Sequence, residues 1–449
     1  MPNEATTCSE RLPLTAYRLP LTAYLFTMAN PATQVQRTYL LLTLLSTLAA
    51  SFIWGINTLF LLDAGLSNAE AFAANAFFTA GMVVFEVPTG VIADTWGRRT
   101  SYLLGAATLL VSTLLYLYMW RTHAPLWGWA ISSVLLGLGF TFFSGATEAW
   151  LVDALTFTGI KHKLEPVLAR GQIVGGAAML GGSLAGGFIA QTTSLGMPYV
   201  IRSVVLGLTL IAAFVWMKDL GFTPKRSRGL VSEVRSILEQ SIDSGWRNPP
   251  VRWLMLAALF AGGVTGYAFY ALQPYLLQLY GDPHAFGVAG LAASIVAGTQ
   301  MLAGLLAPHL RRLFRRRTEA LVAMYLAGAC CLAGLGLTSS FPVAVGLLVV
   351  WGFAFSVGMP LRQTYINGII PTEQRATVLS LDMLMSSAGG VVAQPALGRV
   401  ADVSGYPLSY VISGAIQSVA LPFLVLARRE NAKSDVIQVV GPRVGEAAT

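Results

Sequence analysis

Long apolar runs, each bounded by charged residues, glycine or proline, dominate the pattern of hydrophobic and polar positions along the chain. A helix needs about 20 apolar residues to cross a lipid bilayer, and twelve runs are of that order of length. Their approximate spans are 38–63, 69–93, 100–120, 126–156, 167–193, 197–218, 252–279, 284–308, 318–339, 341–368, 376–399 and 405–427. The alternating strands of about ten residues that build an outer-membrane barrel do not occur. The pattern therefore predicts an all-α membrane protein with 12 transmembrane helices.

A polar stretch at 219–251 divides the twelve spans into two sets of six, and the two sets echo each other. The Pro-x-x-x-Arg pattern at 166–170, before the fifth span, returns at 371–375 before the eleventh span. The sixth and twelfth spans also open alike, at Gly196 and Gly405. Parallel repeats of this kind are typical of transporters whose halves move against each other around a central site. We therefore predict two pseudo-symmetric six-helix bundles.

The predicted units follow from these boundaries. They are a disordered N-terminal tail at 1–36, an N-terminal bundle at 37–218, a cytoplasmic linker at 219–251, a C-terminal bundle at 252–427 and a disordered cytoplasmic tail at 428–449. Within the linker, residues 229–242 place apolar side chains at helical spacing, which is typical of an amphipathic helix on the membrane surface. A merely solvated linker is an equally good interpretation of the same residues.

Composition excludes an ordinary soluble globule and indicates how the chain is oriented. Of the residues, 55% are hydrophobic and 11% are charged, with a mean hydropathy of +0.64; a typical soluble domain is about 25% charged. The net charge is +8. With the N-terminus placed in the cytoplasm, all but three of the 29 Lys and Arg residues (Arg121, Arg202 and Arg399) fall on the cytoplasmic side. This pattern predicts that both termini are cytoplasmic, and it accounts for the positive charge without a nucleic-acid partner.

The most specific motif lies in the loop after the second span. It reads Gly90-Val-Ile-Ala-Asp94-Thr-Trp-Gly97-Arg98-Arg99. It resembles the signature loop of the major facilitator superfamily, Gly-x-x-x-Asp-Arg/Lys-x-Gly-Arg-Arg/Lys, and departs from it at Thr95, where the family usually has a cation. With the twelve spans and the repeat, the resemblance covers about 38–427. It implies the fold of two six-helix bundles and a secondary transporter similar to bacterial drug-efflux permeases.

The resemblance also implies that this loop is a conformational latch. Asp94 would lie beside the start of the eleventh helix, near Ala376, where the helix dipole favours a negative charge. Arg98 would pair with Asp153 at the inner end of the fourth span. Such a latch would join the two bundles while the outer face is open, and it must break before the inner face opens. Positive-inside topology alone is the plainer interpretation of Arg98 and Arg99.

Glycines cluster in the fifth span at Gly182, Gly186 and Gly187. They resemble the Gly-x-x-x-Gly-Pro-x-x-Gly-Gly element of proton-coupled drug antiporters, with Ser183 in place of the proline and Ala178 in place of the first glycine. Close packing of helices through small residues explains the same glycines equally well.

Acidic residues inside membrane spans are costly, so each one is a candidate for function. The candidates for ion coupling are Glu86 in the second span, Glu148 in the fourth and Asp382 in the eleventh. For the two glutamates, the alternative is a structural charge network on the cytoplasmic side. For Asp382, the alternative is a pair with Arg362, which lies at a similar depth.

In the superfamily, the first, fourth, seventh and tenth spans line the central cavity. In this chain, the candidate substrate-cavity residues on those spans are Trp54, Asn57, Tyr267, Tyr270, Gln273, Arg362 and Gln363. A cavity lined by aromatic and amide groups with few charges suits an amphipathic or weakly cationic ligand. Packing between helices remains the alternative for each aromatic residue taken singly.

Signatures of other functions are missing from the sequence. No Walker Gly-x-x-x-x-Gly-Lys-Ser/Thr run occurs, and the four histidines are not paired at metal-ligand spacing. We therefore expect no cofactor, no metal and no enzymatic activity. The leading hypothesis is proton-coupled efflux of amphipathic or drug-like compounds by a monomer in the bacterial inner (plasma) membrane, with the bilayer, a small-molecule substrate and protons as its partners. The alternatives are an uptake permease for a small metabolite and a non-transporting sensor or scaffold on the same fold.

Overall fold

The computed structural model describes residues 31–160, 164–224, 245–310, 313–371 and 375–437, and most of these are helical. The predicted amphipathic segment 229–242 and the first 30 residues lie outside this described part of the chain. Residues 31–36, which we expected to be disordered, are helical because α2 begins at Pro31. Proline favours the first turn of a helix, where its missing N–H removes no hydrogen bond.

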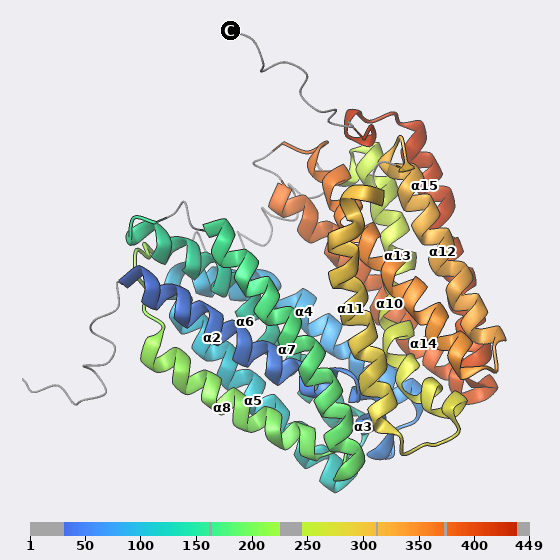
Figure 1. Cartoon of the computed structure of the whole chain (residues 1–449), viewed down its shortest axis with the longest axis horizontal. Helices are drawn as coiled ribbons and strands as arrows, with labels where there is room; N and C mark the ends of the chain where they lie inside the picture. The colour runs from blue at the N-terminus through green and yellow to red at the C-terminus, as the bar shows by residue number, and fades with distance from the viewer. Residues whose placement is uncertain (1–30, 161–163, 225–244, 311–312, 372–374, 438–449) are drawn as a thin grey trace, which may run out of the picture.

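The two halves of the chain form two helical bundles, coloured blue to green and yellow-green to red in Figure 1. The N-terminal bundle contains α2 (Pro31–Trp54), α3 (Asn57–Asp63), α4 (Asn68–Trp96), α5 (Arg98–Thr122), α6 (Leu126–Phe157), α7 (Leu164–Thr192) and α8 (Met197–Trp216). The C-terminal bundle contains α10 (Pro249–Tyr280), α11 (Phe286–Leu310), α12 (Arg317–Leu337), α13 (Phe341–Asn367), α14 (Arg375–Ser418), α15 (Ala420–Arg429) and the short 3₁₀ helix η5 (Lys433–Asp435). The predicted all-α architecture is confirmed.

Eleven stretches of the described residues are long and apolar enough to cross a membrane. The longest, Val378–Arg429, contains a break at Gly405, whose φ of 82° is a conformation that glycine adopts readily. This stretch therefore holds the eleventh and twelfth predicted spans. Each of the twelve predicted spans thus corresponds to helical structure, six in each bundle, and the chain is a multi-pass membrane protein.

The first span differs from the prediction, because the run at 38–63 is two helices, α2 and α3, separated at Gly55 and Ile56. Gln273 of α10 compensates for the break. Its Oε1 accepts a hydrogen bond from the Thr58 backbone N–H at 2.8 Å, and its Nε2 donates to the Trp54 carbonyl at 3.0 Å. An irregular backbone is tolerated at membrane depth only where protein or water satisfies it. The apolar pattern could not reveal a break that a distant side chain supports.

Two pairs of helices join the bundles: α4 packs against α14, and α7 packs against α11. In terms of spans, the second meets the eleventh and the fifth meets the eighth, so each half contributes the same two spans to the interface. This reciprocity is expected when one six-helix unit is duplicated. The bundles converge toward the end that carries α3, called the α3 end below, and diverge toward the opposite end (Figure 1).

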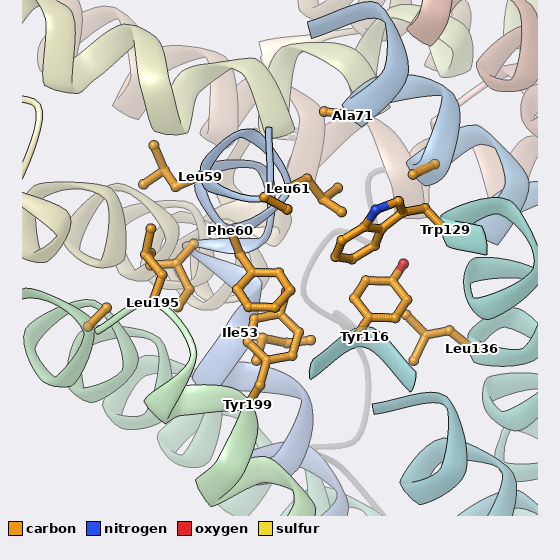
Figure 2. Packing of buried hydrophobic residues seen from close by; sticks show 14 of the residues in the cluster. Ile53, Leu59, Phe60, Leu61, Ala71, Tyr116, Trp129, Leu136, Leu195 and Tyr199 are labelled. Carbon is orange, nitrogen blue, oxygen red and sulfur yellow. The ribbon is translucent and has the colours of Figure 1, made fainter. Parts of the chain in front are cut away.

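Aromatic packing fixes α3 inside the N-terminal bundle. The ring of Phe60 stacks on Tyr199 with centroids 3.9 Å apart, and Trp129 meets it edge-on at 6.0 Å (Figure 2). Tyr116 lies against both Trp129 and Tyr199. Rings of this size bury large apolar areas, and stacked and edge-on pairs add to that stabilisation. The short helix after the break is therefore held rigidly.

The segment after α15 folds back onto the start of α12. The carboxylate of Asp435, which is 1% exposed, accepts hydrogen bonds from the backbone N–H of Thr318 at 2.8 Å and from its hydroxyl at 2.9 Å. The first turn of a helix has N–H groups without partners in the helix, and an acceptor there stabilises it. The predicted disordered tail at 428–449 is therefore wrong for the residues up to 437; residues 438–449 lie outside the described part.

Small residues bring α7 close to its neighbours. A Cβ added at Gly182 would overlap Ser51 of α2, and one at Gly186 would overlap the backbone of Phe52. A Cβ at Gly187 would lie 2.6 Å from the carbonyl oxygen of Phe286, across the bundle interface on α11. This geometry accounts for the three glycines by close packing. A role like that of the antiporter element stays a prediction.

We predict that Gly186→Ala destabilises the protein by about 1–3 kcal/mol, because the added methyl group forces α7 away from α2. The melting temperature of the purified protein would fall. Gly181→Ala is the matched control, since nothing lies within 4 Å of a Cβ at this neighbouring exposed position. Equal melting temperatures for the two variants would contradict the tight packing of α7 on α2.

Candidate functional site

The loop between α4 and α5 turns sharply at Gly97, whose φ is 106°. A side chain at this position would overlap the carboxylate of Asp219, which follows α8. Asp219 accepts a hydrogen bond from the Arg99 backbone N–H at 2.8 Å and so caps the first turn of α5. The Arg99 guanidinium donates to the carbonyl of Phe214 at 2.7 Å. Gly97 and Arg99 therefore hold the end of α8 against the start of α5.

Arg98 lies between two carboxylates. Its guanidinium is 2.5 Å from an oxygen of Asp94 and 3.8 Å from an oxygen of Asp153 at the end of α6. The structure thus brings together Asp94, Arg98 and Asp153, three of the four charged residues that the family resemblance assigns to the latch. Residues 372–374 and the side chain of Ala376, where we expected the neighbour of Asp94, lie outside the described part. The latch role stays a prediction.

Glu86 of α4 and Glu148 of α6 have exposed side chains, in the halves of their helices that point away from the α3 end. Glu148 interacts electrostatically with Tyr39 of α2. Neither glutamate is buried among other side chains of the bundle. Their coupling roles stay predictions.

A cavity of about 300 Å³ lies between α10, α12, α13 and α14, and an ion pair forms part of its wall. Arg362 of α13 donates through Nε to Asp382 of α14 at 3.1 Å and makes a second hydrogen bond to the other carboxylate oxygen. Two further N–H groups donate to the Tyr325 hydroxyl at 3.2 Å and to the Leu254 carbonyl at 2.9 Å. A buried charge is tolerated when it is paired and hydrogen-bonded, and four of the five N–H groups of Arg362 have an acceptor among these partners.

The rest of the cavity wall is mostly apolar. The rings of Trp351 and Phe355 stack with centroids 6.2 Å apart, and Met324, Met359 and Met383 also line the cavity. Gln363 and Gln417 add amide groups. Because Arg362 and Asp382 neutralise each other, the wall offers an apolar surface with polar groups and no net charge. Arg362 and Gln363 are the two predicted substrate-cavity residues that line this cavity.

Three other predicted cavity residues are buried against protein groups. Asn57, Tyr267 and Gln273 are 8%, 0% and 2% exposed. Asn57 bonds to Asn75 at 2.8 Å and to Tyr199 at 2.9 Å, and the Tyr267 hydroxyl bonds to Ser409. Gln273 supports the break after α2. In this conformation their polar groups are hydrogen-bonded to other protein groups, as most buried polar groups are, and they do not line the cavity beside Arg362.

Trp54 and Tyr270, the last two predicted cavity residues, belong to an aromatic cluster between the bundles. Trp54 of α2 stacks on Phe269 of α10 with centroids 4.5 Å apart. Tyr270 meets Phe269 edge-on at 5.4 Å. The cluster lies next to Gln273 and strengthens the contact between the two bundles near the α3 end.

The sequence prediction missed three charged residues with clear structural roles. Asp219 and Asp402 were not among the predicted site residues, and both accept backbone hydrogen bonds at helix starts. Arg202, which we placed near the outer face, is 1% exposed and donates to Thr113 at 3.0 Å and to the Ala49 carbonyl at 2.8 Å. It therefore ties α8 to α5 and α2. A helical-repeat pattern carries no signal for such contacts between distant segments.

Comparison with known proteins identifies the family. A family model described as Major Facilitator Superfamily matches residues 39–393 and 284–443. The chain belongs to the major facilitator superfamily. It is 19% identical over 403 residues to an uncharacterized MFS-type transporter of Methanocaldococcus jannaschii, and the alignment covers 86% of this chain and 96% of that relative.

Solved structures support the same fold. A variant of the nucleoside transporter NupG matches with a TM-score of 0.73 at 13% identity, over 88% of this chain and 100% of that chain. A bacterial homologue of the human lysosomal transporter Spinster, in an inward-facing and unoccupied conformation, matches with a TM-score of 0.68 at 15% identity, over 91% of this chain and 99% of that chain. At these identities the likeness concerns the fold alone. The superfamily and these relatives are transporters. Separately, within the described residues no group of His, Cys, Asp and Glu could hold a metal ion.

We predict that Asp382→Leu destabilises the protein by about 3–5 kcal/mol, because it leaves Arg362 charged and buried without its partner. The double variant Arg362→Met with Asp382→Leu removes both charges and should recover most of that loss. Thermal unfolding of the two variants and the wild type measures the difference. A double variant no more stable than Asp382→Leu would contradict a pair that acts as one unit.

Proposed function

We propose that this superfamily member is a secondary active transporter that exports an amphipathic, drug-like small molecule by alternating access, in exchange for protons. The observation that carries the proposal is the cavity beside the Arg362–Asp382 pair. It is large enough for a small organic molecule, and polar groups are placed at a few points on an otherwise apolar wall. Small-molecule sites have this composition.

The arrangement of the bundles supports alternating access. Helix pairs, the Gln273 hydrogen bonds and the Trp54–Phe269 stack join the bundles near the α3 end, and the bundles diverge toward the end that carries Arg98. With the N-terminus in the cytoplasm, the α3 end faces outward and this conformation faces inward. The Arg98 ion pairs to Asp94 and Asp153 lie within the N-terminal bundle, so they do not hold the two bundles together at that end.

The cavity wall favours one class of cargo. Trp351 and Phe355 provide aromatic surface for a flat apolar body, and Gln363 can donate and accept hydrogen bonds. A polyanion is a poor fit, since the guanidinium of Arg362 is already bonded to Asp382. A neutral or singly charged amphipathic molecule fits these groups best. Nucleoside transport, the activity named for one structural relative, is the competing candidate for cargo.

We predict that amphipathic aromatic compounds raise the melting temperature of the purified protein, whereas polyanions such as nucleoside triphosphates do not. A ligand at 100 times its Kd stabilises the folded state by about 2.7 kcal/mol. Phe355→Ala and Gln363→Ala should each reduce this shift. Val111→Ala, on the exposed face of α5, is the control. Stabilisation by nucleosides in place of amphipathic compounds would favour the uptake permease.

Proton coupling is tested separately in proteoliposomes. If Glu148 carries the coupling proton, Glu148→Gln should lower flux driven by a pH gradient about tenfold or more, while exchange of labelled for unlabelled substrate continues. The reason is that exchange at equilibrium needs the substrate site but no change in protonation. Glu165→Gln, at an exposed acid in the first turn of α7, is the control. Unchanged pH-driven flux in Glu148→Gln would exclude this residue as the coupling site.

A further inference from the structure

Asp402 of α14 bonds to the start of α4 in the opposite bundle. One carboxylate oxygen accepts the backbone N–H of Asn68 at 2.8 Å, and the other accepts the backbone N–H of Ala69 at 2.9 Å. These are the first two residues of α4, whose N–H groups have no acceptor within their own helix. Hydrogen bonds from a helix start to a carboxylate are charge-assisted, and the helix dipole strengthens them.

The surroundings of Asp402 hold this contact in place. The Tyr406 hydroxyl, just after the break at Gly405, donates to the Asn68 side chain. Gly398, one turn before, lies so close to α4 that an added Cβ would be 2.9 Å from the Asn68 carbonyl oxygen. The nearby acid Glu70 bonds to Ser67 in a capping box within its own bundle. Asp402 itself forms no ion pair among the described residues, so the helix start balances its charge.

Helices α4 and α14 each carry a carboxylate far from their own first residue. Asp94 lies 26 residues after Asn68, the first residue of α4, and Asp402 lies 27 residues after Arg375, the first residue of α14. At 1.5 Å per helical residue, both separations are about 40 Å. Each helix therefore carries a carboxylate about 40 Å from its own start; Asp402 lies at the α3 end, bonded to the start of α4, and Asp94 lies at the opposite end, beside Arg98.

We infer that Asp402 locks the α3 end shut, and that each transport cycle must break its two hydrogen bonds to α4. The inference rests on the proposed alternating access and adds the residue that holds one of the two states. When the α3 end opens, the N–H groups of Asn68 and Ala69 and the carboxylate pass into water. The closed state loses its advantage when either side of this contact is removed.

The first test measures how often the α3 end is closed. Thr193 and His284 are exposed and flank the Gln191–Gly287 hydrogen bond between α7 and α11. Cys8, Cys330 and Cys331 are replaced by alanine, and Thr193→Cys and His284→Cys then each carry a spin label. Electron–electron double resonance then reports short and long distances in lipid nanodiscs. Asp402→Ala should raise the ratio of long to short distances about tenfold or more, because both charge-assisted bonds to α4 are lost.

The control for charge is Asp63→Ala. Asp63 is a carboxylate at the same end, and it bonds to Trp120 within its own bundle, so its removal should leave the distance ratio unchanged. Asp402→Asn, which keeps the size and one carbonyl oxygen, should give an intermediate ratio. It also carries the test if Asp402→Ala is not recovered as folded protein. Ratios for Asp402→Ala or Asp402→Asn equal to that of the wild type would overturn the lock.

A second test removes the donor and leaves Asp402 intact. Asn68→Pro deletes the N–H that bonds to Asp402, and proline is well tolerated at the first position of a helix. Asn68→Ala is the matched control, since it loses only the side chain that bonds to Tyr406. The proline variant should open the α3 end more than the alanine variant, and equal ratios would count against the lock. Neither test measures flux, so a protein that moves no cargo but shows these shifts would refute the proposed function and retain the lock.

Discussion

A lipid bilayer offers no hydrogen-bonding partners, and this constraint governs the structure. Wherever a helix breaks or a charge is buried, another part of the chain must supply the partner. Gln273 satisfies the break after α2, and Asp382 with Tyr325 and Leu254 satisfies Arg362. Asp435 does the same for the start of α12. The irregular places in the fold are therefore the places where distant segments are bonded together.

The interactions within each bundle differ from those between the two bundles. Within a bundle, glycines and aromatic rings allow helices to pack closely over long stretches, as α7 does on α2 and as Phe60 does among its neighbours. Between bundles, the polar contact depends on a few hydrogen bonds near the α3 end. Two rigid bodies joined in this way can change their relative orientation without changes inside either body. The reciprocal use of the same two spans from each half suits such a motion.

The sequence was a good guide to local pattern and a poor guide to partners. Apolar runs give the helices, and the echo between halves gives two bundles, because both signals depend on near neighbours along the chain. The loop motif also led to the proximity of Arg98 and Asp153. Asn57 and Gln273 could not be assigned, because an amide on an apolar helix looks the same whether it faces a cavity or a neighbouring backbone. The fold of residues 430–437 depends on Thr318, more than a hundred positions earlier.

The bonds of Gln273 have a consequence for the speed of the cycle. One side chain of the C-terminal bundle completes the backbone of a helix in the N-terminal bundle, so the two bundles share one hydrogen-bonded unit. If the bundles separate at this point, the Thr58 N–H and the Trp54 carbonyl lose their partner in the same step. Until water reaches the break and bonds to these two groups, their lost hydrogen bonds raise the energy barrier to opening. Hydration of a single helix break then contributes to the activation energy of turnover.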